Sequence, residues 1–270
     1  MSVDDAPPLD DAFPLDARLV ESFRSDGCVL VRGLASPDEV AAYRDTIEAA
    51  ALDKAWDKRP LAERDTYGQA FLQSQNLWRV DPLIERFVLA KRFAGVAATL
   101  LGVNSVRLYH DQALCKEPGG GRTPWHQDQY YWPFDVDQTI TMWMPLVDVT
   151  ADVGSMTFVS GSHLLGDLRG RAISDASDEE FTHLIADQQL PTHTFGALRA
   201  GDATFHAGWT VHSAGPNPTD QIRTVMTIIY FADGARVLEE LSPAQDFDRR
   251  MWLSATPLGG LIDNPGNPRL

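Results

Sequence analysis

The sequence lacks several features that would assign it to a class at once. Its 270 residues include two cysteines, Cys28 and Cys115, which are too few for a disulfide framework and lack the spacing of a metal or redox motif. The formal net charge is −15, and the sequence contains no cluster of Lys and Arg. Nucleic acid is therefore not an expected partner. No apolar run is long enough to cross a bilayer, and the acidic first residues lack the positive start and apolar stretch of a signal peptide. We therefore expect a cytoplasmic protein with no membrane partner.

The composition is that of an ordinary globular protein. Hydrophobic residues make up 44% of the chain and charged residues 23%, which is enough apolar material for a sizeable core. The length suits one domain over residues 1–270, and no repeat or linker marks off a second. The acidic balance disfavours a polyanionic substrate such as an acyl-coenzyme A.

The first hundred residues carry mainly helical patterns. Residues 1–15 are rich in Asp and Pro and are expected to form a flexible leader. Ser36 and Glu39 form the signature of a capping box at the start of a helix. Residues 16–102 are therefore expected to form a helical front. Its main helices are predicted over residues 16–26, 37–50 and 82–101.

From Ser105 onward the pattern is typical of β-strands. Residues 139–149 alternate, with Thr139, Thr141 and Trp143 on one face and Ile and Met residues on the other. Strands after a helical front predict a mainly β fold with a helical layer (α+β), whose core over residues 103–235 is a jelly roll, the cupin-like double-stranded β-helix. The polar insertion 164–195 is expected to form a lid, and residues 236–270 form a turn-rich tail. In the first strand, one face is expected to carry Val106, Leu108, His110, Gln112, Leu114 and Lys116.

One short stretch carries the strongest chemical signal. His126 and Asp128 are two residues apart, and in an extended strand this spacing places both side chains on one face. They would be two ligands of a metal site, and His212, before a turn-rich stretch, is the best third ligand. Two His and one carboxylate with open positions are typical of non-haem iron(II) oxygenases. A lone His-x-Asp usually just faces water, so the interpretation depends on its surroundings.

The surroundings favour a cosubstrate with a free carboxylate. Arg223 follows His212 across a dense turn signal, and a hairpin centred between Asn217 and Pro218 would place the two on facing positions of neighbouring strands. The keto acid end of 2-oxoglutarate occupies two open positions on iron and leaves one for O2. The planar fork of an arginine can bind its other carboxylate. The plainer interpretation of Arg223 is a surface residue at the base of a hairpin.

Together these residues resemble the phytanoyl-CoA dioxygenase family of iron(II)- and 2-oxoglutarate-dependent oxygenases. The resemblance covers about residues 105–232 and is weaker over the helical front. It implies that His126, Asp128 and His212 bind iron(II) and that Arg223 binds the distal carboxylate of 2-oxoglutarate. The matching segments are His126-Gln127-Asp128, Tyr131-Trp132-Pro133-Phe134, Trp143, Gly154, Gly161-Ser162-His163, Gly201-Asp202, and His212 through Asn217 to Arg223.

Further residues are assigned around this centre. The family pattern implies that Trp143 and Gln127 line the site, and Gln112 or Lys116 is expected to add a polar contact to the cosubstrate. His206 is expected to be a structural histidine of the core.

One position departs from the family pattern. Several members carry a serine two residues after the distal histidine, where it helps to bind the cosubstrate carboxylate, and this chain has Ala214 there. Ser213 is expected to point to the other face. Thr139 or Thr141 is therefore expected to supply the missing hydroxyl.

The implied function is oxidation of an unactivated C–H bond in a small organic substrate, coupled to decarboxylation of 2-oxoglutarate to succinate and CO2. Hydroxylation is the default outcome, with ring closure, epimerisation and desaturation as alternatives. The aromatic residues near the motif, the acidic charge and the insertion favour a bulky secondary metabolite. Competing hypotheses are an acyl-CoA hydroxylase of the same family, a cupin-like metal-dependent hydrolase or isomerase, and a non-catalytic sandwich. A halogenase is disfavoured because Asp128 is present, and the oligomeric state stays unknown.

Overall fold

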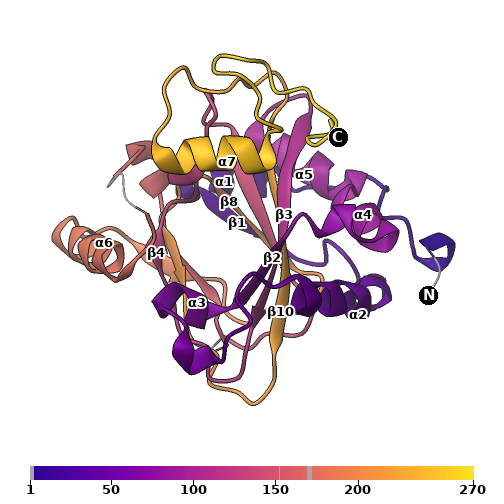
Figure 1. Cartoon of the computed structure of the whole chain (residues 1–270), viewed down its shortest axis with the longest axis horizontal. Helices are drawn as coiled ribbons and strands as arrows, with labels where there is room; N and C mark the ends of the chain where they lie inside the picture. Colours follow the sequence, from indigo (N-terminus) through magenta and orange to yellow (C-terminus); the bar gives the residue numbers. More distant parts are fainter. Residues whose placement is uncertain (1–2, 152, 169–171) are drawn as a thin grey trace.

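Two antiparallel β-sheets face each other and enclose part of the core (Figure 1). The structure, a computed structural model, describes residues 3–151, 153–168 and 172–270. Within these residues, the arrangement confirms the predicted α+β jelly roll with a helical layer. The larger sheet has six described strands in the order β1 (Cys28–Val31), β8 (Ala203–Ala207), β5 (Thr139–Pro145), β10 (Arg223–Ala232), β3 (Val106–Lys116) and β2 (Leu72–Gln75). The smaller sheet has four, in the order β4 (Thr123–His126), β9 (His212–Ala214), β6 (Met156–Val159) and β7 (Thr192–Thr194).

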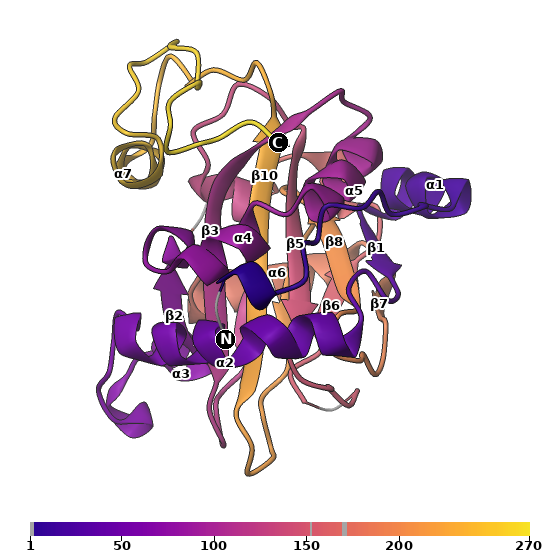
Figure 2. The same cartoon turned by 90° about the vertical axis from the view of Figure 1, so that its right-hand side faces the viewer.

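Helices from the first hundred residues cover the outer face of the larger sheet (Figure 2). They are α1 (Ala17–Asp26), α2 (Pro37–Lys54), α4 (Pro82–Val88) and α5 (Lys91–Leu101). The capping box of α2 is confirmed, because Ser36 Oγ accepts from the Glu39 N–H and the Glu39 carboxylate accepts from the Ser36 N–H. Three more helices lie elsewhere in the described chain: α3 (Thr66–Ala70) and α6 (Asp175–Asp187) beside β4, and α7 (Pro243–Trp252) in the C-terminal segment.

The alternation of side chains along β5 is confirmed. Ile140 and Met142 belong to the core under the helices, whereas Thr141 and Trp143 face the space between the sheets. The uniform face predicted for β3 is wrong, because the pairing with β10 shifts between Ile229 and Tyr230. This β-bulge inserts Tyr109, so Val106 and Leu108 pack under the helices while His110, Gln112 and Leu114 face the interior.

Two expectations for the first hundred residues are also wrong. The helix predicted over 82–101 is broken at Leu89 and Ala90, where the backbone of Ala90 is extended. The described part of the expected flexible leader, residues 3–15, is packed: Ala6 and Leu9 are buried and the Arg92 N–H donates to the Leu9 carbonyl. Residues 1–2 lie outside the described residues.

The predicted pairing of His212 with Arg223 is wrong as well. β9 belongs to the smaller sheet and β10 to the larger one, so the connection between them crosses from sheet to sheet. Its middle residue, Asn217, forms backbone hydrogen bonds with Gly119 and Gly120 instead of closing a hairpin. In the part of the chain that the structure describes, no helix is both long and apolar enough to cross a membrane.

Candidate functional site

The three predicted metal ligands meet in the space between the sheets. His126 ends β4 and pairs with His212, the first residue of β9. Asp128 begins a short 3-10 helix (Asp128–Tyr131) directly after β4, rather than continuing the strand. One ligand atom from each of the three side chains lies within 4.8 Å of the other two. The predicted convergence is confirmed.

Backbone contacts orient both histidines toward this point. Nδ1 of His126 lies 2.8 Å from the Pro124 carbonyl, and Nδ1 of His212 lies 2.9 Å from the Thr210 carbonyl. A carbonyl oxygen only accepts, so Nδ1 carries the proton in both rings and the Nε2 lone pairs remain for a metal ion. The two Nε2 atoms lie 3.5 and 3.8 Å from Asp128 Oδ1. Two imidazole nitrogens and one carboxylate oxygen are a donor set that fits iron(II) with open positions.

The electrostatics favour the ligand forms of these groups. Burial alone would raise the pKa of Asp128, but the surrounding histidines outweigh it and hold the pKa well below its usual range. Burial, reinforced by His126 and His206, lowers the pKa of His212 well below its ordinary value. A carboxylate and a neutral imidazole are the forms that bind a divalent cation.

The second oxygen of Asp128 is held by the larger sheet. Nε2 of His206 on β8 lies 3.1 Å from Oδ2, and the Thr141 hydroxyl on β5 donates to the same oxygen at 3.0 Å. Nδ1 of His206 is buried without a hydrogen-bond partner. A proton on Nε2 lets the ring donate to the carboxylate, whereas a proton on Nδ1 would set two acceptors against each other. The expectation of a purely structural His206 was therefore too narrow, since it positions Asp128.

A cavity of about 410 Å³ opens at this centre, and His126, Asp128, His206 and His212 line it. Tyr131 and Trp132 from the aromatic stretch also contribute, whereas Trp125 packs in a separate apolar cluster. Among the described residues of the insertion 164–195, Ile173 reaches the cavity, and residues 169–171 lie outside the described chain. The largest contribution missed from the sequence comes from α7, which supplies Ala244, Phe247, Asp248 and Trp252.

Arg223 forms the cationic end of the cavity. It is 3% exposed, its guanidinium carbon lies 5.3 Å from the Trp143 ring, and its Nη1 donates to the Gly154 carbonyl at 2.7 Å. Lys116, opposite it on β3, is fully buried, with Nζ 2.6 Å from the Gly121 carbonyl. Neither cation has an acidic partner among the described residues, and Nε of Arg223 has no hydrogen-bond partner.

Burial lowers the pKa of Arg223 to about 10. It also lowers the pKa of Lys116 to about 7, and the adjacent charge of Arg223 adds to that effect. Two buried cations without an anion are costly unless a ligand completes the site. The arrangement can therefore bind a carboxylate.

Gln112 and Gln127 were both assigned to the site, but only Gln112 lies in the cavity wall. Gln112 lines the cavity and accepts from the Gln73 amide at 2.8 Å. Gln127 lies outside the described cavity lining, contrary to the prediction, because its amide joins two loops. It donates to the carbonyls of Gly166 and Trp209 and accepts from the Leu168 N–H.

Thr139 and Thr141, the two residues expected to supply the missing hydroxyl, both bind protein acceptors. Thr139 donates to Gln129, and Thr141 donates to Asp128, so both hydroxyls are occupied. Thr123 on β4 is paired with Ala214 across the strands and lines the cavity. Ser213, which was expected to point away, lines it too. The pairing of Thr123 with Ala214 joins segments about ninety residues apart and was not visible in the sequence.

Comparisons with known proteins agree with this geometry. The family model described as Phytanoyl-CoA dioxygenase (PhyH) matches residues 23–225. A probable alpha-ketoglutarate-dependent hypophosphite dioxygenase from Stutzerimonas stutzeri is 29% identical over 161 residues, which are 56% of this chain and 54% of that protein. The chain thus spans about half the length of this curated relative.

Two solved structures from nogalamycin biosynthesis are similar over nearly their whole length. The non-heme alpha ketoglutarate dependent epimerase SnoN is 29% identical with a TM-score of 0.76, over 94% of this chain and 97% of that one. The carbocyclase SnoK is 25% identical with a TM-score of 0.76, over 95% and 96%. SnoN has also been solved in complex with Fe3+, alpha ketoglutarate and nogalamycin RO.

Proposed function

Because this chain belongs to the phytanoyl-CoA dioxygenase family of iron(II)- and 2-oxoglutarate-dependent oxygenases, we propose that it oxidises a C–H bond of a small, bulky organic molecule. The observation that carries this proposal is the convergence of His126, Asp128 and His212 in one cavity with a buried Arg223 that has no acidic partner among the residues described. The three ligands would hold iron(II), which with 2-oxoglutarate and O2 supplies C–H oxidation coupled to formation of succinate and CO2.

The chain's own residues prepare the centre for that chemistry. The carbonyls of Pro124 and Thr210 fix the histidine tautomers, and His206 and Thr141 fix the free oxygen of Asp128. Ligands held in this way need little reorganisation when the metal ion binds.

Arg223 would bind the distal carboxylate of 2-oxoglutarate, as the absence of an acidic partner in the described chain supports. Its hydrogen bond to Gly154 and its position over Trp143 hold the fork in place. Thr123 would supply the hydroxyl that Ala214 cannot, because the two residues pair across β4 and β9 and the Thr123 side chain lines the cavity. Gln112 is a further polar contact in the same cavity.

The substrate would be a secondary metabolite rather than an acyl-coenzyme A. Arg223 is the only Lys or Arg side chain in the described lining, so the phosphates of a coenzyme A would find no second cation there. Aromatic walls suit a bulky apolar body, and the similar enzymes SnoN and SnoK come from nogalamycin biosynthesis. Hydroxylation, epimerisation and ring closure all begin with the same oxidation. A metal-dependent hydrolase would leave Arg223 without a function.

Several broader assignments belong to the same proposal. The helical front, both sheets and the C-terminal tail act as one oxygenase domain over residues 1–270, since α7 and both sheets line one cavity. The protein works in the cytoplasm, where its free, buried cysteines Cys28 and Cys115 stay reduced. The part of the insertion 164–195 that reaches the cavity contributes to substrate choice.

Succinate formation tests the proposal. The purified protein is incubated aerobically with Fe(II) and 2-oxoglutarate, and succinate is measured against samples lacking metal or exposed to a chelator. Slow, iron-dependent succinate formation is expected even without the substrate, and Asp128→Ala should abolish it. His183→Ala, which changes an exposed histidine of α6, is the matched control and should retain it. Failure of the wild-type protein both to bind 2-oxoglutarate and to form succinate would contradict the proposal.

A further inference from the structure

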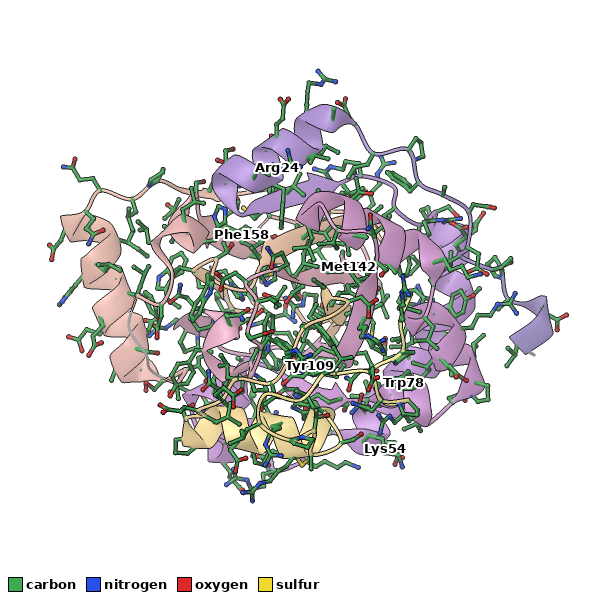
Figure 3. The ribbon with its side chains drawn as sticks, turned by 90° about the horizontal axis from the view of Figure 1, so that it is seen from above. Arg24, Lys54, Trp78, Tyr109, Met142 and Phe158 are labelled. Carbon is green, nitrogen blue, oxygen red and sulfur yellow. The ribbon has the colours of Figure 1, made fainter. Side chains whose placement is uncertain are left out.

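A buried carboxyl group lies in the wall that α7 contributes to the cavity. Asp248 is 9% exposed, lines the cavity, and accepts a hydrogen bond from the Tyr109 hydroxyl at 2.8 Å. The Trp252 side chain forms a second hydrogen bond to it. In Figure 3, Tyr109 lies against the C-terminal segment drawn in yellow. The β-bulge in β3 turns His110 into this part of the cavity, while Tyr109 packs behind the lining and reaches Asp248 through its hydroxyl.

Asp248 has no cationic partner in the described chain. The two arginines of the same helix, Arg249 and Arg250, both pair with Asp246 on the outer side of α7. His110 is nearby, but burial lowers its pKa to about 4, so its ring is neutral. Burial likewise raises the pKa of Asp248 to about 7, against the hydrogen bonds from Tyr109 and Trp252. The carboxyl group thus lacks the countercharge that would stabilise it.

Asp248 mirrors Arg223 in the same cavity. Among the described residues, Arg223 is a buried cation without an acidic partner and Asp248 is a buried acid without a cationic partner. A buried charge is stable when it is paired and hydrogen-bonded. Each of these two groups therefore favours a ligand that carries a group of the opposite charge. The carboxylate of 2-oxoglutarate meets this requirement at Arg223, and the substrate must meet it at Asp248.

We propose that Asp248 is a substrate anchor that binds a protonated aliphatic amine carried by a bulky aromatic or polycyclic molecule. This assignment of the substrate class rests on the proposed oxygenase function of the same cavity. Around Asp248 the lining is aromatic: Trp56 and Phe247 are 58% and 51% exposed, and Trp252 is buried. Trp56 and Trp252 lie 6.3 Å apart at their ring centroids. Aromatic faces attract cations and cover flat apolar surfaces, and the net charge of −15 favours approach of a cation over an anion.

Three matched probes test the proposal. 2-(2-Naphthyl)ethylamine, 2-(2-naphthyl)ethanol and 3-(2-naphthyl)propionate share one aromatic body and differ in charge. Each is titrated at pH 7.5 into the protein with Mn(II) in place of iron(II) and with 2-oxoglutarate, and binding is followed by calorimetry and tryptophan fluorescence. The amine is expected to bind at least about tenfold more tightly than the alcohol, as for a hydrogen bond to a charged group, and the propionate more weakly still.

Variants separate anchoring from a purely structural role. Asp248→Asn should remove the preference for the amine over the alcohol, whereas Asp246→Asn removes the same charge from the outer side of α7 and should keep it. Tyr109→Phe removes a hydrogen bond that stabilises the carboxylate but keeps the carboxyl group, and should weaken the preference without abolishing it. Equal binding of amine and alcohol to the wild-type protein, or no binding of either, overturns the proposal. So does a preference that survives in Asp248→Asn.

The outcome is independent of turnover. If the wild-type protein forms succinate but binds the three probes alike, only this inference fails. If it selects the amine through Asp248 but neither binds nor consumes 2-oxoglutarate, the oxygenase function fails while the amine site stands.

Discussion

Replacing Arg223 with methionine keeps most of the side-chain volume but removes the guanidinium, and it is expected to have two opposite effects. In the free protein, burial lowers the pKa of Arg223 from 12.5 to about 10. A depression of that size corresponds to about 3 kcal/mol of cost for the buried charge. The folded pKa lies below the unfolded one, so the folded state bears this cost at every pH below about 10. Loss of the hydrogen bond to the Gly154 carbonyl offsets about 1 kcal/mol. The free variant should therefore be more stable by about 1–2 kcal/mol.

Binding of 2-oxoglutarate should change in the other direction. A guanidinium that binds a carboxylate through both nitrogens contributes about 1.5–3 kcal/mol, so the affinity should fall by about 10- to 150-fold. Urea unfolding with and without 2-oxoglutarate, in the presence of Mn(II), measures both effects together. Wild-type protein should be stabilised by the cosubstrate, and the Arg223→Met variant should be more stable without it and should need about 10- to 150-fold more cosubstrate for the same stabilisation. Arg236→Met, at an exposed arginine, is the control and should behave as wild type.

Two results would refute this reasoning. Unchanged affinity for 2-oxoglutarate would show that another group binds its distal carboxylate. A free variant destabilised by several kcal/mol would show that Arg223 completes a structural network, as breaking a buried ion pair does.

Three further outcomes are expected. His206→Phe removes the donor to Asp128 Oδ2 and should weaken metal binding by about 10- to 100-fold in a Co(II) titration; unaltered affinity would make His206 merely a core residue. Gly154→Ala would place a Cβ 2.9 Å from Arg223 Nη1 at a φ of 59°. It should lower 2-oxoglutarate affinity by about tenfold in calorimetry, and normal binding would argue against the assigned position of the fork. Folding lowers the pKa of Lys116 from 10.5 to about 7, so the unfolded chain binds more protons between these values. The stability of wild type relative to Lys116→Met should therefore rise from pH 7 to about 9 in urea unfolding, and a flat difference would contradict the assignment.

Short-range patterns predicted the parts of the fold that depend on neighbouring residues. The alternation of Thr141 and Trp143 with Ile140 and Met142 determined the faces of β5, because the side-chain period of a strand is two. The Ser36 capping box marked the start of α2 for a similarly local reason. The pair His126 and Asp128 was found by its spacing, although a 3-10 turn rather than a strand places Asp128.

Features that depend on contacts between distant segments were missed. Nothing local to residues 212–223 shows that β9 and β10 belong to different sheets. The hairpin prediction was wrong because they do. The bulge at Tyr109 exists only in the pairing of β3 with β10. Helix α7 was hidden in a tail that looked turn-rich, but Ser242 and Gln245 form a capping box that was a usable signal. Its position over the cavity was not predictable from that box.

The two histidines of the proposed metal site come from the smaller sheet and Asp128 follows its strand β4, whereas Arg223, Thr141 and His206 come from the larger sheet. A molecule that binds both the iron and Arg223 would therefore connect the two sheets. Its binding free energy would add to the free energy needed to separate them. A small separation of the sheets that leaves every helix and strand intact would still move the metal site away from Arg223. Catalytic competence should consequently disappear before secondary structure does when the protein is heated, and saturation with cosubstrate should narrow that interval.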